Sequence, residues 1–149
     1  MKKILIVEDD LKIALAVGVR LKANGYEVLT AFDAMAGVAM AVKHVPDLVI
    51  LDISIPAGSG FLVAERLQSM TPTFGTPIIF MTGSRNPEFQ AKAMKLGAVA
   101  FMEKPFQNGE LIAQVRKALG EEPAPPMSAP PMPAAVLAPG ESEALKLGA

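Results

Sequence analysis

Five short runs of apolar residues, separated by longer stretches with helical spacing, extend through the first 120 residues of the chain. The runs cover residues 3–7, 27–30, 48–51, 78–81 and 99–102. Most of them are continuous rather than alternating, which is typical of strands buried on both faces of a parallel sheet. The intervening spacing predicts helices near residues 11–24, 34–43, 60–70, 87–96 and 108–119.

Glycines mark the ends of three of these helical stretches. Gly25, Gly97 and Gly120 each stand where a helix would finish in a left-handed cap. Regular strand–helix alternation predicts a doubly wound α/β domain. In such sheets, ligands bind beyond the carboxyl ends of the strands, so we expect the chemistry just after residues 7, 51, 81 and 102.

The composition changes abruptly after Gly120. Seven prolines lie between Pro123 and Pro139, interleaved with alanine and methionine. Proline at this density is incompatible with a helix or a central strand. The sequence therefore predicts one domain over residues 1–120 and a Pro/Ala-rich acidic tail over residues 121–149, extended or disordered and without a second folded domain.

Charge and cysteine content exclude several classes of function. The chain has no cysteine, which rules out disulfides, thiolate metal sites and thiol nucleophiles. Residues 1–120 carry 13 Lys and Arg against 11 Asp and Glu, so the basic excess of a nucleic-acid-binding domain is missing and no direct DNA binding is expected. No apolar run reaches the roughly 18–20 residues that span a bilayer, and the apolar start is too short for a signal peptide. We expect a cytoplasmic protein without membrane association.

Polar side chains follow the strands at the edge where chemistry is expected. These residues are Glu8, Asp9, Asp10, Asp52, Thr82 and Lys104. Converging carboxylates repel one another unless a cation joins them. A site of oxygen ligands alone suits a hard cation, and Mg²⁺ is the best candidate. With Mg²⁺ and Lys104 balancing the acids, a carboxylate could accept a phosphoryl group that bare acids would repel.

Four segments in order resemble the receiver domain of response regulators in two-component signalling. They are ILIVEDD (4–10), DLVILDISIP (47–56), MTG (81–83) and the region from Gly97-Ala98 through Phe101 to Lys104-Pro105-Phe106. The resemblance covers residues 1–120 and is to single-domain, chemotaxis-regulator-like members. It implies a flavodoxin-like fold, with a five-stranded parallel sheet in the order 2-1-3-4-5.

The same resemblance implies a role for each matching residue. Asp52 matches the phosphoacceptor. The metal ligands would be Glu8 through water, Asp9 directly, Asp52, and the backbone carbonyl of Ser54. Thr82, Lys104 and Phe101 match the switch hydroxyl, the bridging cation and the aromatic whose rotamer follows the threonine, and Lys104-Pro105 matches a cis peptide.

The function implied is a phosphorelay switch. A partner histidine kinase or histidine phosphotransfer protein would donate the phosphoryl group to Asp52. The fourth helix, fifth strand and fifth helix would then present an altered face to an unknown downstream protein. The chain would not be an enzyme beyond Mg²⁺-dependent self-phosphorylation and dephosphorylation.

Departures from the family pattern and two alternative functions remain. Residues 57–60 differ from the usual loop, and Val99-Ala100 replaces an acidic pair, which weakens the expectation of a dimer through the switch face. An aspartyl-phosphate phosphohydrolase would need a second acid where Ser54 stands. A flavin-binding module would need a Ser/Thr/Gly-rich loop where Glu8 begins an acidic run. Asp10 and Asp33 precede helical stretches and are predicted to be N-caps.

Overall fold

The computed structural model describes residues 1–121, so the expected tail lies outside the described residues except for Glu121. The strands are β1 (Lys3–Val7), β2 (Glu27–Ala31), β3 (Leu48–Asp52), β4 (Ile78–Thr82) and β5 (Ala100–Glu103). The helices are α1 (Leu11–Ala23), α2 (Ala34–His44), α3 (Gly60–Gln68), α4 (Pro87–Lys95) and α5 (Asn108–Ala118). Strand and helix alternate throughout, as the hydrophobic pattern predicts.

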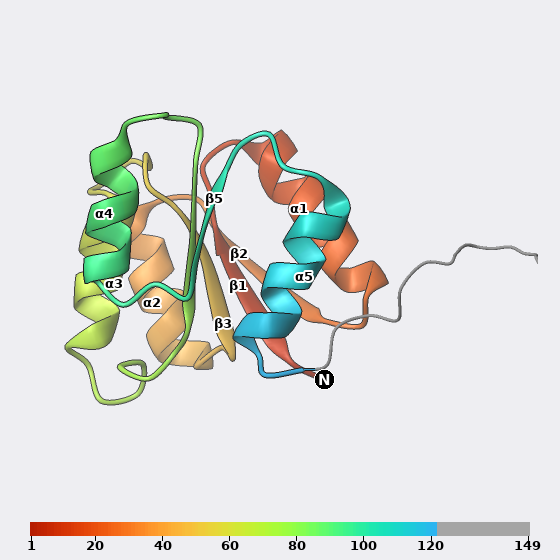
Figure 1. The fold of residues 1–149 in the computed structure, drawn as a ribbon. Helices are drawn as coiled ribbons and strands as arrows, with labels where there is room; N and C mark the ends of the chain where they lie inside the picture. Colours follow the sequence, from red (N-terminus) through yellow and green to blue (C-terminus); the bar gives the residue numbers. More distant parts are fainter. Residues whose placement is uncertain (122–149) are drawn as a thin grey trace, which may run out of the picture.

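The five strands form one parallel sheet in the order β2-β1-β3-β4-β5, which confirms the predicted topology. Helices α1 and α5 cover one face, whereas α2, α3 and α4 cover the other (Figure 1). The central strand β3 pairs with β1 on one side and β4 on the other. The carboxyl ends of these three strands therefore lie together at one edge of the sheet.

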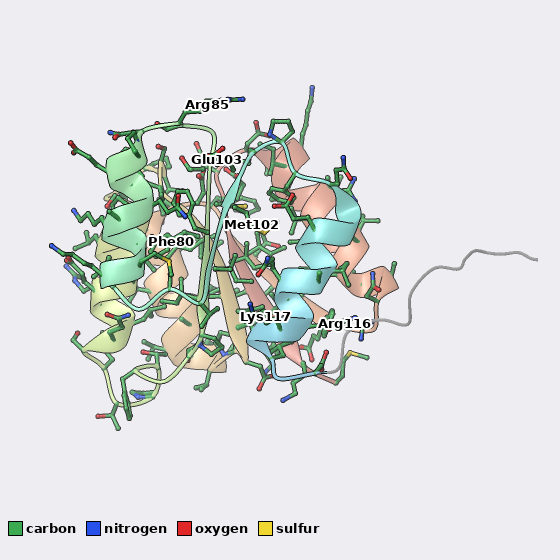
Figure 2. All side chains as sticks on the ribbon, viewed as in Figure 1. Phe80, Arg85, Met102, Glu103, Arg116 and Lys117 are labelled. Atoms are coloured by element: carbon green, nitrogen blue, oxygen red, sulfur yellow. The ribbon has the colours of Figure 1, made fainter. Side chains whose placement is uncertain are left out.

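Two apolar layers explain why the strand sequences are continuous rather than alternating. Alternate residues of each central strand enter opposite layers, as Leu5 and Ile6 do in β1. Phe80 lies in the layer beneath α3 and α4, whereas Met102 lies in the layer beneath α5 (Figure 2). Burial on both faces removes apolar surface from water along the whole strand.

Local signals set the helix boundaries. The side chain of Asp10 accepts hydrogen bonds from the backbone N–H groups of Lys12 and Ile13, and that of Asp33 accepts one from Ala36, which confirms both predicted N-caps. The three cap glycines have φ values between 70° and 90°, in the left-handed region that glycine adopts without strain.

Most elements end within one residue of the expected position, and the largest difference, two residues, is at the end of α3. Helix α3 ends at Gln68 because Ser69 already turns out of the helix, and its hydroxyl donates to the Arg66 carbonyl. Strand β5 begins one residue late, at Ala100. Within residues 1–121, no helix has the length and apolar character needed to cross a bilayer.

Candidate functional site

Asp52 is the last residue of β3 and lies beside Met81 of β4. Its exposed fraction is only 4%. An ionised carboxylate is rarely this buried unless cations or hydrogen-bond donors compensate for the lost water. Its surroundings therefore decide what it can do.

Glu8 and Asp9 follow β1 and complete an acidic cluster with Asp52. One carboxylate oxygen from each of the three residues lies within 4.8 Å of the others. Glu8 is 1% exposed, whereas Asp9 is open to solvent. Asp10 does not join them, because its carboxylate caps α1. The structure thus brings together the acid pair inferred from the resemblance.

Lys104 supplies the positive charge at this cluster. Its Nζ lies 2.7 Å from Oε1 of Glu8 and 3.5 Å from Oδ2 of Asp52. Its backbone N–H donates to the carbonyl of Thr82 at 2.7 Å, which fixes the residue directly after β5. The Lys104–Pro105 peptide is cis, as the resemblance implies. We call Glu8, Asp9, Asp52 and Lys104 together the acidic edge.

The acidic edge alters the proton affinities of its members. Burial raises the pKa of Glu8, and the nearby Asp52 acts in the same direction, against the hydrogen bond from Lys104. Burial opposes the charged form of Lys104, but the hydrogen bond to Glu8 and the charges of Asp52 and Glu8 outweigh it and raise its pKa. The ammonium group therefore stays charged beside the carboxylates at neutral pH.

The remaining site residues of the sequence analysis surround this edge. Thr82 ends β4, is buried, and its hydroxyl oxygen accepts a hydrogen bond from the N–H of Ser84 at 3.0 Å. Phe101 is half-buried opposite Phe80 in the sheet register and packs against the layer beneath α3 and α4. Ser54 is exposed in the loop after β3 and shares a surface depression with Asp9.

Gly60 is a site-forming residue that the sequence analysis does not identify. It is the first residue of α3, and its N–H donates to the carbonyl of Ile53 at 2.8 Å. A Cβ added there would lie 2.4 Å from the backbone oxygen of Asp52. Only a residue without a side chain allows α3 to begin this close to the carboxyl end of β3. The only signal in the sequence is a glycine at a helix start.

The donor set fits a hard divalent cation. Three carboxylates supply oxygen ligands only, and one of them reaches solvent, through which an ion could enter with part of its water shell. Within residues 1–121, Lys104 makes both of the close ion pairs, so three acids share a single nearby ammonium group. A bound cation would relieve the remaining negative charge.

The comparison with protein families decides the class of this domain. The model of the response regulator receiver domain matches residues 4–116. This chain belongs to that family. The family resemblance, the fold and the assignment to two-component regulation are therefore confirmed, and the chain carries a receiver domain rather than an enzyme of an established catalytic family.

Characterised relatives are response regulators of bacteria. The chain is 35% identical over 119 residues to the "DNA-binding dual master transcriptional regulator RpaA" of Synechocystis, with 80% of this chain and 49% of that protein covered. It is 35% identical over 118 residues to the phosphate regulon transcriptional regulatory protein PhoB of Pseudomonas aeruginosa, with 79% of this chain and 52% of that protein covered. The chain spans about half the length of these curated relatives.

Solved structures of isolated receivers match over nearly their whole length. A CheY-like receiver protein from Methanospirillum hungatei superposes with a TM-score of 0.75 at 30% identity, covering 80% of this chain and 94% of that one. Chemotaxis response regulator CheY4 of Vibrio cholerae superposes with a TM-score of 0.75 at 31% identity, covering 80% of this chain and 99% of that one. These relatives support neither the phosphohydrolase nor the flavin-binding alternative.

Proposed function

We propose that Asp52 accepts a phosphoryl group and that this chain acts as a phosphorelay switch in the cytoplasm. The observation that carries the proposal is the acidic edge. A buried carboxylate at the end of the central strand lies beside two further acids and 3.5 Å from a lysine ammonium group. Without cations, the three carboxylates would repel an approaching anion. Lys104 and a bound cation would balance their charge and so allow a phosphate to approach.

The transfer is an exchange of one bond to phosphorus for another. A carboxylate oxygen of Asp52 attacks the phosphorus of a phosphohistidine on a histidine kinase or phosphotransfer protein. The new P–O bond forms as the P–N bond breaks, and the imidazole leaves with the electron pair and takes up a proton. Mg²⁺ held by Glu8, Asp9, Asp52 and the Ser54 carbonyl would neutralise phosphoryl oxygens. Lys104 would contact the same oxygens from the β5 side.

The switch would run from Thr82 to Phe101. Thr82 ends β4, the strand next to β3 and Asp52, and its hydroxyl accepts a hydrogen bond from Ser84. On phosphorylation this hydroxyl would turn from Ser84 toward the phosphoryl group. The movement would vacate space that the half-buried ring of Phe101 can enter. The face of α4, β5 and α5 would then favour a different partner, because phosphorylation shifts the population of two states.

The test is labelling with a small phosphodonor. Phosphoramidate with Mg²⁺ should add one phosphoryl group per chain, detected by intact-protein mass spectrometry, and Asp52→Asn should abolish the adduct. Asp47→Asn is a matched control, because Asp47 lies at the opposite end of β3 and bonds the backbone N–H of Lys3. Equal labelling of Asp52→Asn, or loss of labelling in Asp47→Asn alone, would exclude Asp52 as the acceptor.

A further inference from the structure

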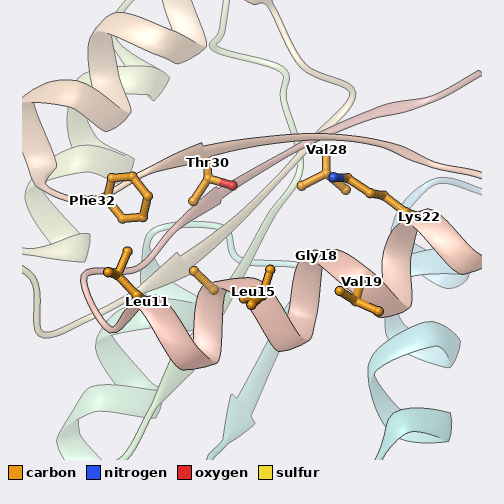
Figure 3. Close-up of a pocket in the computed structure, with 9 residues that line it drawn as sticks. Leu11, Leu15, Gly18, Val19, Lys22, Val28, Thr30 and Phe32 are labelled. Atoms are coloured by element: carbon orange, nitrogen blue, oxygen red, sulfur yellow. The ribbon is translucent and has the colours of Figure 1, made fainter.

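An apolar groove lies between α1 and the edge strand β2, on the flank of the domain away from the proposed switch face. Its volume is about 270 Å³, below the range of about 300–1,000 Å³ that encloses small ligands. The large apolar residues that line it are Leu11, Leu15, Val19, Val28 and Phe32, and Thr30 lines it as well. The α1 side chains face those of β2 and Phe32 across the groove (Figure 3). We call it the α1–β2 groove.

The exposure of its α1 wall is unusual for a globular surface. Leu11, Leu15 and Val19 are 66%, 69% and 58% exposed, and they recur every four residues along one stripe of the helix. The stripe that α1 turns toward the sheet is a separate one, formed by residues such as Val17 and Leu21. A second continuous apolar stripe on the same helix marks a contact surface rather than scattered exposed residues.

The described chain ends at Glu121, which contacts the turn that joins α1 to β2, the two elements that form this groove. The carboxylate of Glu121 accepts a 2.6 Å hydrogen bond from the hydroxyl of Tyr26, and its N–H donates to the carbonyl of Arg116 at 2.8 Å. Tyr26 directly precedes β2 and bonds through its N–H to Leu21 of α1. Lys22, next along α1, lines the end of the groove. The described chain is therefore held at Glu121, near that end of the groove.

The length of chain beyond this point is sufficient to fill the groove. From Lys22 back to Leu11 the groove follows 11 residues of α1, a distance of about 16 Å. An extended proline-rich chain advances about 3.1 Å per residue, so residues 122–133 could span about 37 Å. The tether and the length together favour this chain's own segment over an external ligand.

The chemistry of the segment also matches the groove. Residues 122–133 contain six prolines and two methionines, Met127 and Met132, and such side chains bury well against aliphatic and aromatic walls. Proline carbonyls accept hydrogen bonds but proline nitrogens do not donate, whereas β2 is an edge strand whose outer backbone N–H groups need acceptors. Glu122, the one charged residue of the segment, is opposite in charge to Lys22, the charged residue of the groove.

We propose that residues 122–133 pack back on their own domain along the α1–β2 groove, running from Lys22 toward Leu11. The groove is thus an intramolecular docking site for the proline-rich segment. Its far end, at Leu11, is two residues from Asp9 of the acidic edge. The docked segment consequently lies near the entrance to the phosphorylation site.

A spin label on the full chain tests this directly. The chain contains no cysteine, so Ser128→Cys provides a single attachment point for a nitroxide. Amide signals of Leu15, Val19 and Thr30 should lose most of their intensity in the labelled protein, whereas those of the distant β5 should not. Adding Leu15→Lys should restore the signals. Phe74→Lys, at a residue with a similar exposed fraction of 66% on the loop before β4, should leave the broadening unchanged.

Three outcomes would overturn the proposal. Broadening spread evenly over the surface, or absent from the groove, would show that the segment does not dock there. Broadening that persists in Leu15→Lys would place the contact outside the groove. Broadening in a mixture of spin-labelled chains with isotope-labelled chains lacking the nitroxide would make a second copy the occupant. The amide spectrum itself reports whether each variant is folded, and both lysine substitutions replace exposed side chains.

Discussion

The acidic edge and the α1–β2 groove break the usual rules of burial in opposite ways. At the edge, Glu8 and Asp52 are charged side chains almost fully withdrawn from water. In the groove, Leu11 and Leu15 are large apolar side chains left mostly in water. Each arrangement lowers stability locally, because buried charge loses hydration and exposed apolar surface gains nothing from the core. Such departures mark places where a protein binds something.

The two regions also differ in how they are assembled. The edge collects residues from three strand ends that are up to 96 positions apart, and it is closed by tight backbone packing at Gly60. The groove arises from one helix and the strand that follows it. A rigid, overdetermined site suits chemistry that depends on distances between atoms. An open stripe of side chains suits a segment that can adapt its contacts.

The largest expected effect comes from breaking the tight packing at the acidic edge. Gly60→Ala would place a methyl group 2.4 Å from the backbone oxygen of Asp52, so either α3 or the end of β3 must move. We expect a loss of about 3 kcal/mol in the free energy of unfolding, at the upper end of overpacking effects. Urea denaturation of the variant and the parent measures it. A loss below 1 kcal/mol would show that α3 can shift at little cost.

The next largest effect comes from removing the ammonium group that balances the negative charge of the acidic edge. Lys104→Met leaves Glu8 and Asp52 close together without a cation, and breaking a buried pair in this way costs about 3–5 kcal/mol. Because Lys104 keeps some contact with solvent, we expect about 2 kcal/mol at neutral pH. Added Mg²⁺ should recover part of this loss by binding the folded state.

Lys95→Met is the control for that substitution, since Lys95 is exposed at the end of α4. Thermal denaturation with and without Mg²⁺ compares the two variants. Equal stabilities for both variants would mean that solvent already screens the carboxylates at the edge.

Replacing a glycine of the groove with alanine should change the free energy of unfolding in the opposite direction from Gly60→Ala. Gly18 lies inside α1, and a Cβ added there would meet Val28 at 3.6 Å and Ile6 at 3.8 Å, which are ordinary contacts. Gly18→Ala should therefore stabilise the domain by about 0.5–1 kcal/mol through helix propensity. The same urea denaturation measures it, and a destabilised variant would show that α1 packs more tightly on β2 than its glycine contacts indicate.

The contrast between the regions also explains what the sequence could predict. The fold and the acidic edge could be predicted because most strands are continuous apolar runs. A polar residue directly follows the apolar run of a strand, as Asp52 does in β3 and Thr82 in β4. The close approach of α3 to the end of β3 at Gly60 could not be predicted, because it depends on the path of the loop between Asp52 and α3. Nor does periodicity reveal which apolar stripe of α1 faces the sheet, since Leu15 and Val17 look alike in sequence.

The smallest expected effect concerns the contact that holds Glu121, the last described residue, near the groove. Tyr26 is the single tyrosine of the chain, so the ultraviolet absorbance of tyrosinate reports its ionisation alone. Burial, the hydrogen bond to Glu121 and the charge of Glu121 raise the pKa of Tyr26 from 10.0 to about 12, and Arg116 opposes them. Glu121→Gln keeps an acceptor oxygen but removes the charge, so this pKa should fall toward 10.0 while staying above it because burial remains.

The sign of the linked stability change follows from the raised pKa. The native state holds the Tyr26 proton more tightly than the unfolded state, so this contribution to stability is complete below pH 10 and is lost as the pH rises toward about 12. Glu121→Gln should narrow the pH range over which this stability is lost. Glu110 is exposed in the first turn of α5, so Glu110→Gln should leave that pH range unchanged. Absorbance titration of the parent, Glu121→Gln and Glu110→Gln measures the Tyr26 pKa in each folded protein, with the denatured chain of each as reference. A Tyr26 pKa that is the same in Glu121→Gln and the parent would show that Glu121 does not hold the described chain at the turn between α1 and β2. It would also remove the fixed starting point on which docking of residues 122–133 depends.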